Sequence, residues 1–232
     1  MSLRSRLRDS DLLNALVART AALWLRLCTG TTRWTVEGDD GLRAALRDGP
    51  VILVLWHEHM LFGPVHWRRF DPQLLSLVDT SPIGRVAGAI QARFGQRPMP
   101  MSPKASNLAV SRAVRTAVDA GLCIGIAADG PAGPRRIPRD AALIWARTTG
   151  LPVFAYAYSM TRHRRLDTWD RLILPLPFGR GRIRYARWDG TVPRRPAPDE
   201  WDRCRSSLRA ALDANADAVG GERNRGPHET VA

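Results

Sequence analysis

From residue 50 onward, short β-branched apolar runs alternate with segments of helical periodicity, and this alternation limits the possible folds more than any other feature. Buried strands are expected at residues 51–56, 74–78, 122–127 and 153–158, and a last strand at 182–188. Helices are expected at residues 85–94, 107–120, 140–149 and 199–219. This order favours an α/β fold with a mostly parallel central sheet covered by helices. Ligands are then expected beyond the carboxyl ends of the strands.

The chain has 232 residues, which suits one large or two small domains and allows a sizeable core. We expect an N-terminal amphipathic helix within residues 1–30, the α/β domain at 31–218 and a mobile tail at 219–232. The three cysteines are far apart and form no CxxC pair, so neither a disulfide framework nor a zinc site is expected. A reducing, cytosolic setting follows from this cysteine usage.

The apolar stretch at residues 12–28 predicts an amphipathic helix. One stripe at helical spacing comprises Leu13, Leu16, Val17, Thr20, Leu23, Trp24 and Leu27. Arg19 and Arg26 interrupt the stretch on the flank of this stripe, so neither a cleavable signal peptide nor a membrane span is expected. The stripe can pack on the core. It can also lie in a lipid interface, where tryptophan beside arginine is typical.

The formal net charge is +13, and 34 of the 35 basic residues are arginines, the exception being Lys104. Residues 131–190 hold twelve arginines against four aspartates, a net charge of +8. The planar guanidinium group matches phosphate, so this bias indicates a polyanionic or phosphorylated partner. Nucleic acid, anionic lipid and a phosphorylated small substrate stay open on charge alone.

Two imidazoles and a carboxylate follow the strand expected at residues 51–56: His57, Glu58 and His59. A histidine at the ligand end of a sheet can act as a general base, because its ordinary pKa lies near neutrality and a nearby carboxylate orients the ring. A packed, hydrogen-bonded histidine is the alternative. His-x-His alone supplies too few ligands for a metal ion, so no metal is expected.

The segment Ala-Asp-Gly-Pro-Ala-Gly-Pro-Arg-Arg at residues 128–136 follows the strand expected at 122–127. Its glycines and prolines define a turn that exposes backbone N–H groups, and Arg135 and Arg136 can neutralise a phosphate. The segment is therefore interpreted as an anion-binding loop. The alternative is a rigid strand-to-helix connection whose arginines are merely solvated. Its spacing matches neither a P-loop nor a dinucleotide-binding loop.

The order of three features resembles the lysophospholipid acyltransferase superfamily. These are Trp56-His57 after an apolar strand, the Asp129-Gly130-Pro131 loop with Gly133-Pro134, and Gly150-Leu151-Pro152-Val153. The resemblance runs from about Trp34 to about Trp188. It is closest to a bacterial branch catalogued as a domain of unknown function. It implies transfer of a fatty acyl group from an acyl thioester to a hydroxyl of a membrane lipid.

The resemblance also assigns expected roles to particular residues. His57 is the expected general base. The resemblance supplies no acid for it in this sequence, so Glu58 or Asp79 is expected to replace that carboxylate in space. The expected substrate-binding residues are His59, Ser102, Lys104, Asp129, Gly130, Pro131, Gly133, Arg135 and Arg136.

Several positions depart from the pattern of the superfamily. The acid usually found five positions after the histidine is Phe62 here, and the literal His-x₄-Asp from His66 to Asp71 is interpreted as chance. A Ser-Arg-x-Asp-Gly segment is replaced by residues 80–84, an Arg-Gly-Ser segment by residues 100–104, and an arginine of the loop by Ala132.

Three functional hypotheses follow. The first is a membrane-associated acyltransferase that uses coenzyme A or acyl carrier protein as donor, holds no bound cofactor, and lies peripherally on the cytoplasmic face of the inner membrane. Its partners would be the acceptor lipid, the donor and an anionic membrane surface. The second is a catalytically degenerate relative that binds anionic lipid. The third is a nucleic-acid-binding protein, although no nucleic-acid-binding module accompanies the charge and no specific nucleic acid is expected.

Overall fold

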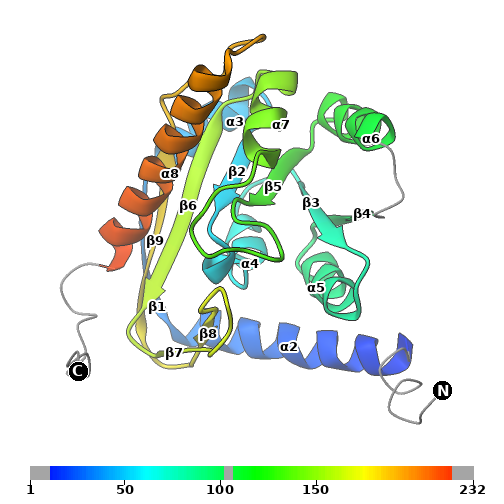
Figure 1. Ribbon diagram of the computed structural model, residues 1–232. Coiled ribbons are helices and arrows are strands. Elements are labelled where there is room, and N and C mark those ends of the chain that lie inside the picture. Colours follow the sequence, from blue (N-terminus) through cyan, green and yellow to red (C-terminus); the bar gives the residue numbers. More distant parts are fainter. Residues whose placement is uncertain (1–10, 102–106, 221–232) are drawn as a thin grey trace.

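The computed structural model of the protein describes residues 11–101 and 107–220, which form an α/β domain built on a seven-stranded sheet (Figure 1). The sheet has the order β1-β9-β6-β2-β5-β3-β4. Its strands are β1 (Arg33–Glu37), β2 (Ile52–Leu55), β3 (Leu74–Asp79), β4 (Arg97–Met101), β5 (Cys123–Ala127), β6 (Val153–Met160) and β9 (Arg180–Arg187). The neighbouring strands among β2, β3, β4, β5 and β6 pair in parallel, whereas β9 runs antiparallel to β6 and parallel to β1.

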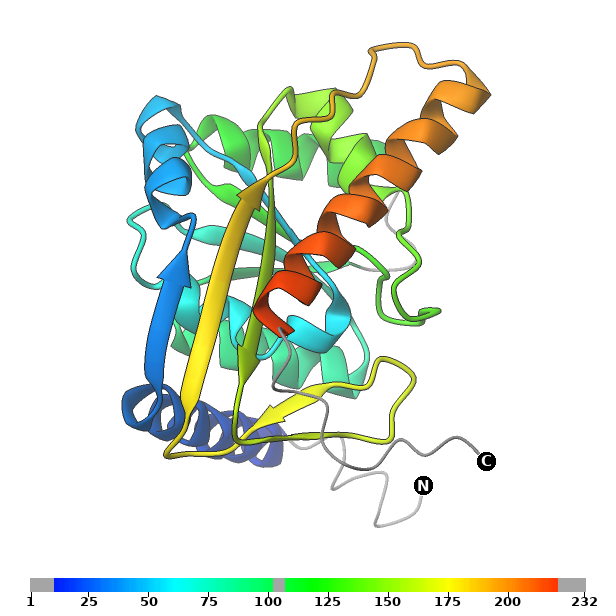
Figure 2. The same ribbon diagram turned by 90° about the vertical axis from the view of Figure 1, so that its left-hand side faces the viewer.

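Helices cover both faces of the sheet (Figures 1 and 2). They are α2 (Asp11–Thr31), α3 (Asp39–Asp48), α4 (Gly63–Trp67), α5 (Pro82–Arg93), α6 (Asn107–Asp119), α7 (Ala141–Thr149) and α8 (Pro198–Gly220). A 3-10 turn, η1 (His57–His59), follows β2 directly. A small hairpin of β7 (His163–Arg165) and β8 (Ile173–Pro175) is inserted between β6 and β9.

Alternating side chains of the central strands build two cores, one on each face of the sheet. In β2, Leu53 and Leu55 belong to the core beneath α2, α3 and α4, whereas Ile52 and Val54 belong to the core beneath α7 and α8. All four β2 side chains are buried because helices lie on both sides. This accounts for the continuous apolar runs of the central strands, which is the pattern typical of parallel sheets.

The sequence-based expectation of fold class is confirmed: the protein is a mostly parallel α/β domain. The five expected strands are present with their ends shifted by at most two residues, and helices occupy all four expected ranges, with the start at residue 85 moving to Pro82. The edge strands β1 and β4 and the helix α3 were not expected. β4 reads Arg-Pro-Met-Pro-Met, and strands with two prolines are tolerated only where one side has no partner.

The N-terminal helix is present as α2, but its expected stripe does not face the core. The six large apolar members of the stripe are between 38% and 60% exposed. The helix packs instead through a second row of smaller residues, in which Ala18, Ala22, Leu25 and Cys28 are buried. Of the two alternatives for the stripe, packing on the core is therefore wrong.

No helix within residues 11–101 and 107–220 is long and apolar enough to cross a membrane. The tail expected at 219–232 begins inside α8, whose last residues are Val219 and Gly220, and its remaining residues lie outside the described part of the chain.

Core packing predicts a contrast between two isoleucines. Ile124 of β5 is fully buried and Ile83 of α5 is 82% exposed. We expect Ile124→Ala to lower the free energy of unfolding by about 2–5 kcal/mol, because it leaves a cavity. The matched change Ile83→Ala should lower it by less than about 0.5 kcal/mol. Urea denaturation monitored by tryptophan fluorescence measures both, and equal losses would contradict the assigned core.

Candidate functional site

The candidate site lies where the adjacent parallel strands β2 and β5 end. Leu55 and Ala127 are register partners at the last positions of these strands. His57 follows β2, and the loop from Ala128 to Asp140 follows β5. The carboxyl ends of parallel strands meet at one edge of a sheet, so the two segments that the sequence singled out are brought together there.

Asp129 joins these two segments by hydrogen bonds. Its carboxylate accepts from the backbone N–H of His57 (N···Oδ1 2.8 Å) and from that of Arg136 (N···Oδ2 3.1 Å). The side chain is fully buried, and burial raises the pKa of its carboxyl even though both N–H donors oppose the shift. Asp129 therefore anchors the loop to the end of β2, and its carboxylate oxygens are occupied by the backbone.

The His57 ring is paired with a carboxylate that the sequence did not single out. Nδ1 of His57 lies 2.6 Å from Oδ2 of Asp170, in the loop between β7 and β8. The Trp169 ring lies beside the imidazole, with 5.1 Å between ring centroids. The prediction that Glu58 or Asp79 pairs with His57 is wrong, since Asp170 occupies that position.

Asp170 is itself held in place by its neighbours. The Thr168 hydroxyl lies 2.5 Å from Oδ1, and the backbone N–H of Leu172 lies 3.3 Å from the same atom. Burial alone would raise the pKa of the Asp170 carboxyl, but the hydrogen bonds from Thr168 and His57 outweigh it and lower that pKa. An ionised Asp170 favours the His57 tautomer with the proton on Nδ1, so Nε2 is free to accept a proton.

Glu58 takes part in a different arrangement, a buried carboxylate clamped by three arginines. Oε2 accepts from Arg135 Nη2 at 2.6 Å and from Arg165 Nη1 at 2.8 Å. Oε1 accepts from Arg136 Nε at 2.9 Å and from its Nη2 at 2.6 Å. Burial opposes ionisation, but His59 and these arginines outweigh it and hold the pKa of Glu58 well below its ordinary value.

His59 and Asp79 have surroundings unlike those expected for them. His59 is buried, its Nε2 lies 3.4 Å from Oε1 of Glu58, and burial lowers its pKa. Asp79 accepts a hydrogen bond from the backbone N–H of Ser81 at the start of α5 and also borders the cavity described next. Asp79 is thus close to the site without being the partner of His57.

An apolar cavity of about 320 Å³ opens beside His57. Its wall runs from β2, β3 and β5 to α4 and α5, and includes Leu55, Leu77, Ile126, Gly63 and Ala87. Gly130 and Pro131 of the loop also line it, which agrees with their expected place in the site. The imidazole therefore stands at a cavity suited to an apolar chain.

The remaining expected residues fall into two groups. Gly133 (φ 66°) lies against Trp169, and a Cβ atom at this position would come within 2.5 Å of the indole ring. The loop after β5 and the loop between β7 and β8 therefore pack closely there. Ser102 and Lys104 lie outside the described residues.

Among the described residues, no group of three or more histidine, cysteine, aspartate or glutamate side chains is arranged to hold a metal ion.

Phe62, five positions after His57, belongs to an aromatic cluster. Phe62 is fully buried and stacks on His66, with 4.9 Å between ring centroids. Nδ1 of His66 lies 2.7 Å from the Tyr156 hydroxyl, whereas Asp71 is exposed. His66 and Asp71 are thus placed apart from the cavity wall, in keeping with their interpretation as a chance match.

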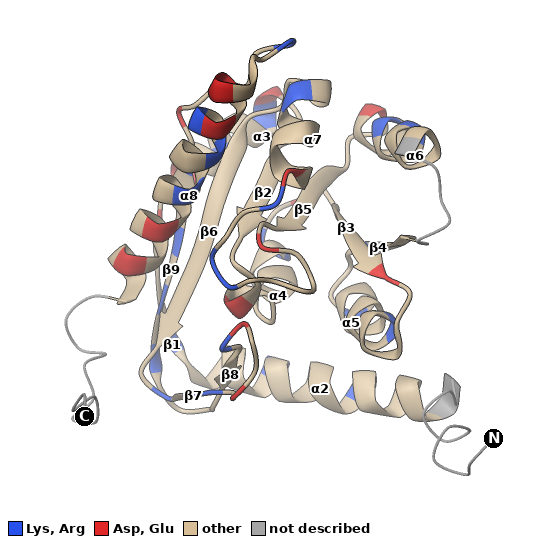
Figure 3. Cartoon of the chain, viewed as in Figure 1, with Lys and Arg blue, Asp and Glu red and all other residues tan. Residues whose placement is uncertain are grey.

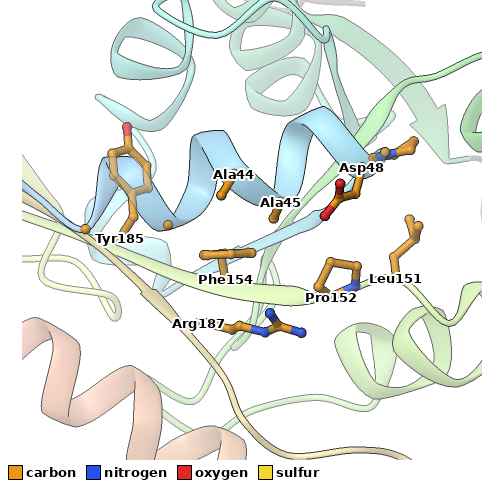
Figure 4. Close-up of a pocket in the computed structure, with 12 residues that line it drawn as sticks. Ala44, Ala45, Asp48, Leu151, Pro152, Phe154, Tyr185 and Arg187 are labelled. Carbon is orange, nitrogen blue, oxygen red and sulfur yellow. The ribbon is translucent and has the colours of Figure 1, made fainter.

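A larger cavity of about 610 Å³ lies between α3 and strands β6 and β9 (Figure 4). Phe154 lines it, and its charged lining residues are Asp48 and Arg187. Pro152 at the start of β6 borders it, so it lies at the end of the sheet opposite to His57. It contains no paired histidine and carboxylate, so the smaller cavity is the better candidate for chemistry.

The Glu58 clamp predicts a stability loss that depends on pH. We expect Glu58→Gln to lower the free energy of unfolding at pH 7 by about 3–5 kcal/mol, because three arginines lose a buried counter-charge. Because the pKa of Glu58 is lower in the folded than in the unfolded state, its carboxylate stabilises the fold at pH values above the unfolded-state pKa, and this stabilisation is lost as pH falls. The difference in free energy of unfolding between wild type and Glu58→Gln should therefore narrow below about pH 4.3. Urea unfolding across pH measures this.

Glu37 provides the matched control for that measurement. It pairs with Arg182 and Arg184, but its side chain is 34% exposed. Glu37→Gln should cost less than about 1 kcal/mol. A loss for Glu58→Gln as small as this would contradict the clamp.

Comparisons with known proteins leave the family of the chain open. No protein-family model matches the sequence. The chain is similar to "Uncharacterized protein RP090" of Rickettsia prowazekii (strain Madrid E), with 23% identity over 189 residues that cover 77% of this chain and 82% of the relative.

Proposed function

We propose that the protein transfers a fatty acyl group from an acyl thioester to a hydroxyl of a lysophospholipid or related membrane lipid. The observation that supports this most is the His57–Asp170 pair, with 2.6 Å between Nδ1 and Oδ2, at the mouth of an apolar cavity. A base oriented by a carboxylate beside an apolar cavity suits an acyl substrate that reacts with a hydroxyl. The resemblance to acyltransferases agrees with this assignment.

In the proposed reaction, Nε2 of His57 accepts the proton of the acceptor hydroxyl as its oxygen attacks the thioester carbonyl carbon. A new C–O bond forms and gives a tetrahedral intermediate with a negatively charged oxygen. The C–S bond then breaks, the carbonyl is restored and the imidazolium returns its proton to the leaving thiolate. The products are an ester and a free thiol. Asp170 stabilises the imidazolium and keeps the ring in position.

The cavity beside His57 is the proposed binding site for the acyl chain. Its wall is mostly apolar and includes Gly63, Gly84 and Gly125. Burial of each methylene contributes about 0.8 kcal/mol, so such a site favours long chains over short ones. The donor is coenzyme A or acyl carrier protein, and the protein works peripherally on the cytoplasmic face of the inner membrane.

The second candidate is a lipid-binding protein without turnover. Arg135 and Arg136, which the sequence assigns to phosphate, have donors committed to Glu58. The acceptor headgroup then has fewer free cations at the loop than the resemblance implies. Acceptor-dependent release of thiol by the wild type separates the two candidates.

The base and its partner are tested by release of free thiol from palmitoyl-coenzyme A and from palmitoylated acyl carrier protein in the presence of lysolipids. His57→Ala should lower kcat by about 10²–10⁴. Asp170→Asn should lower kcat with little change in KM, because it affects orientation and imidazolium stability. Asp71→Asn, an exposed aspartate outside the cavity, is the control and should leave turnover unchanged. If the wild type releases thiol only at a background rate that does not depend on the acceptor, the result would favour the second candidate.

The chain-binding role of the cavity predicts a change in donor preference. Ala87 of α5 lines the cavity, whereas Ala92 of the same helix is exposed. Ala87→Phe should lower kcat/KM for a sixteen-carbon donor by about tenfold relative to a four-carbon donor, because the ring fills space that the long chain needs. Ala92→Phe should leave the ratio unchanged. If Ala87→Phe lowers kcat/KM equally for both donors, the acyl chain binds outside this cavity.

A further inference from the structure

We infer that the outward face of α2 docks the protein on an anionic lipid surface, with the cavity beside His57 turned toward that surface. This face, called the α2 outer face below, comprises Leu16, Val17, Leu23, Trp24 and Leu27. The inference deepens the proposed function, on which it rests for its acceptor, by naming the surface that meets the lipid.

The α2 outer face is apolar in a way that folding of this chain does not explain. Leu16 is 60% exposed, Leu23 54% and Trp24 38%. These side chains lie on one stripe, since they recur at helical spacing. The helix already meets the domain through Ala18, Ala22, Leu25 and Cys28, and the Trp24 indole N–H, at the edge of the stripe, donates to the carbonyl of Pro175 at 3.0 Å. A contiguous exposed apolar stripe of this kind indicates an interaction surface.

The other exposed large apolar side chains are also unevenly distributed. Within residues 11–101 and 107–220 they are Ile83, Leu108, Ile137, Trp169 and Phe178. The first three follow the sheet strands β3, β4 and β5, and the last two follow the hairpin strands β7 and β8. The exposed large apolar side chains include no residue of α3, α7 or α8. Phe178 is 67% exposed and its backbone N–H donates to the Thr31 hydroxyl, so it adjoins the end of α2. Trp169 adjoins His57.

The topology places α2 at the end of the molecule that carries the site. α2 leads into β1, which runs opposite to β2 and β6, so β1 begins where those strands end. In both views α2 lies along the end toward which β6 points (Figures 1 and 2). It packs on α5 and α4, which also form the cavity wall. A lipid layer against α2 would therefore lie close to the cavity.

The charges around α2 favour an anionic lipid over a second copy of the chain. Arg19 and Arg26 are exposed on the flank of the stripe. The neighbouring segment 160–184 holds seven arginines and two aspartates. Arg165 is paired with Glu58, and Arg182 and Arg184 with Glu37, so counting these two glutamates leaves a net charge of +3. Figure 3 shows basic residues on α2 and at β7. A second copy would bring like charges together, whereas anionic headgroups would be attracted to them.

The test is co-sedimentation of the full chain with sucrose-loaded vesicles of phosphatidylcholine alone or with 30% phosphatidylglycerol. Wild type should bind the anionic vesicles more tightly. Leu16→Glu/Leu23→Glu should raise the lipid concentration for half-maximal binding by at least about tenfold, because two apolar contacts are lost and two negative charges are added. The matched control Ala210→Glu/Ala214→Glu adds the same charge to α8 on the opposite face of the sheet and should bind nearly as wild type.

Two further measurements keep this test separate from the proposed chemistry. Turnover with a water-soluble acceptor should be unchanged in Leu16→Glu/Leu23→Glu, and His57→Ala should bind vesicles as wild type does. If no turnover is found with any acceptor, the vesicle result still stands, and only the acyltransferase proposal fails. Unchanged vesicle binding by Leu16→Glu/Leu23→Glu overturns the inference. If that variant also turns a wild-type dimer into a monomer on size exclusion, a second copy covers the α2 outer face.

Discussion

The arrangement of the site depends on the buried carboxylate of Glu58. It joins three segments that are distant in sequence: the end of β2, the loop after β5 through Arg135 and Arg136, and the hairpin strand β7 through Arg165. A buried carboxylate without partners would be expensive, and three guanidinium groups at 2.6 to 2.8 Å offset that cost. The arginines that suggest a phosphate site are thus first of all a structural clamp.

The clamp also explains how the site recovers a carboxylate that the local sequence lacks. Arg165, held by Glu58, is the last residue of β7, and the loop that follows β7 carries Asp170. Fixing this end of the hairpin fixes the loop that sets Asp170 against His57. The position five residues after His57 is then free to carry Phe62, which packs among buried aromatic rings. Adjacent residues therefore have separate roles: His57 faces the cavity, and Glu58 holds the segment that supplies its partner.

The sequence predicts the sheet better than the site. Apolar runs identify β2, β3, β5 and β6 because these strands are buried on both faces, whereas β4 is an edge strand with two prolines and no such pattern. The sequence identifies His57 because this residue follows such a run directly. Asp170 is 113 residues away and lies in a short inserted hairpin, so no local pattern connects it to His57. Glu58 is near His57 along the chain and Asp79 along the sheet edge, but their hydrogen bonds give them other roles.

The helix α2 shows why periodicity alone does not tell which face of a helix meets the core. Its larger apolar residues form the regular stripe, yet the domain contacts the smaller row that includes Ala18 and Ala22. Small side chains let α2 approach α5 closely, and α5 is also a wall of the apolar cavity. The large side chains are thereby left facing outward at the end of the sheet where His57 lies. If the acyl acceptor is a membrane lipid, the same packing that closes the cavity wall also presents leucine and tryptophan to the lipid, so substrate delivery and fold stability use opposite faces of one helix.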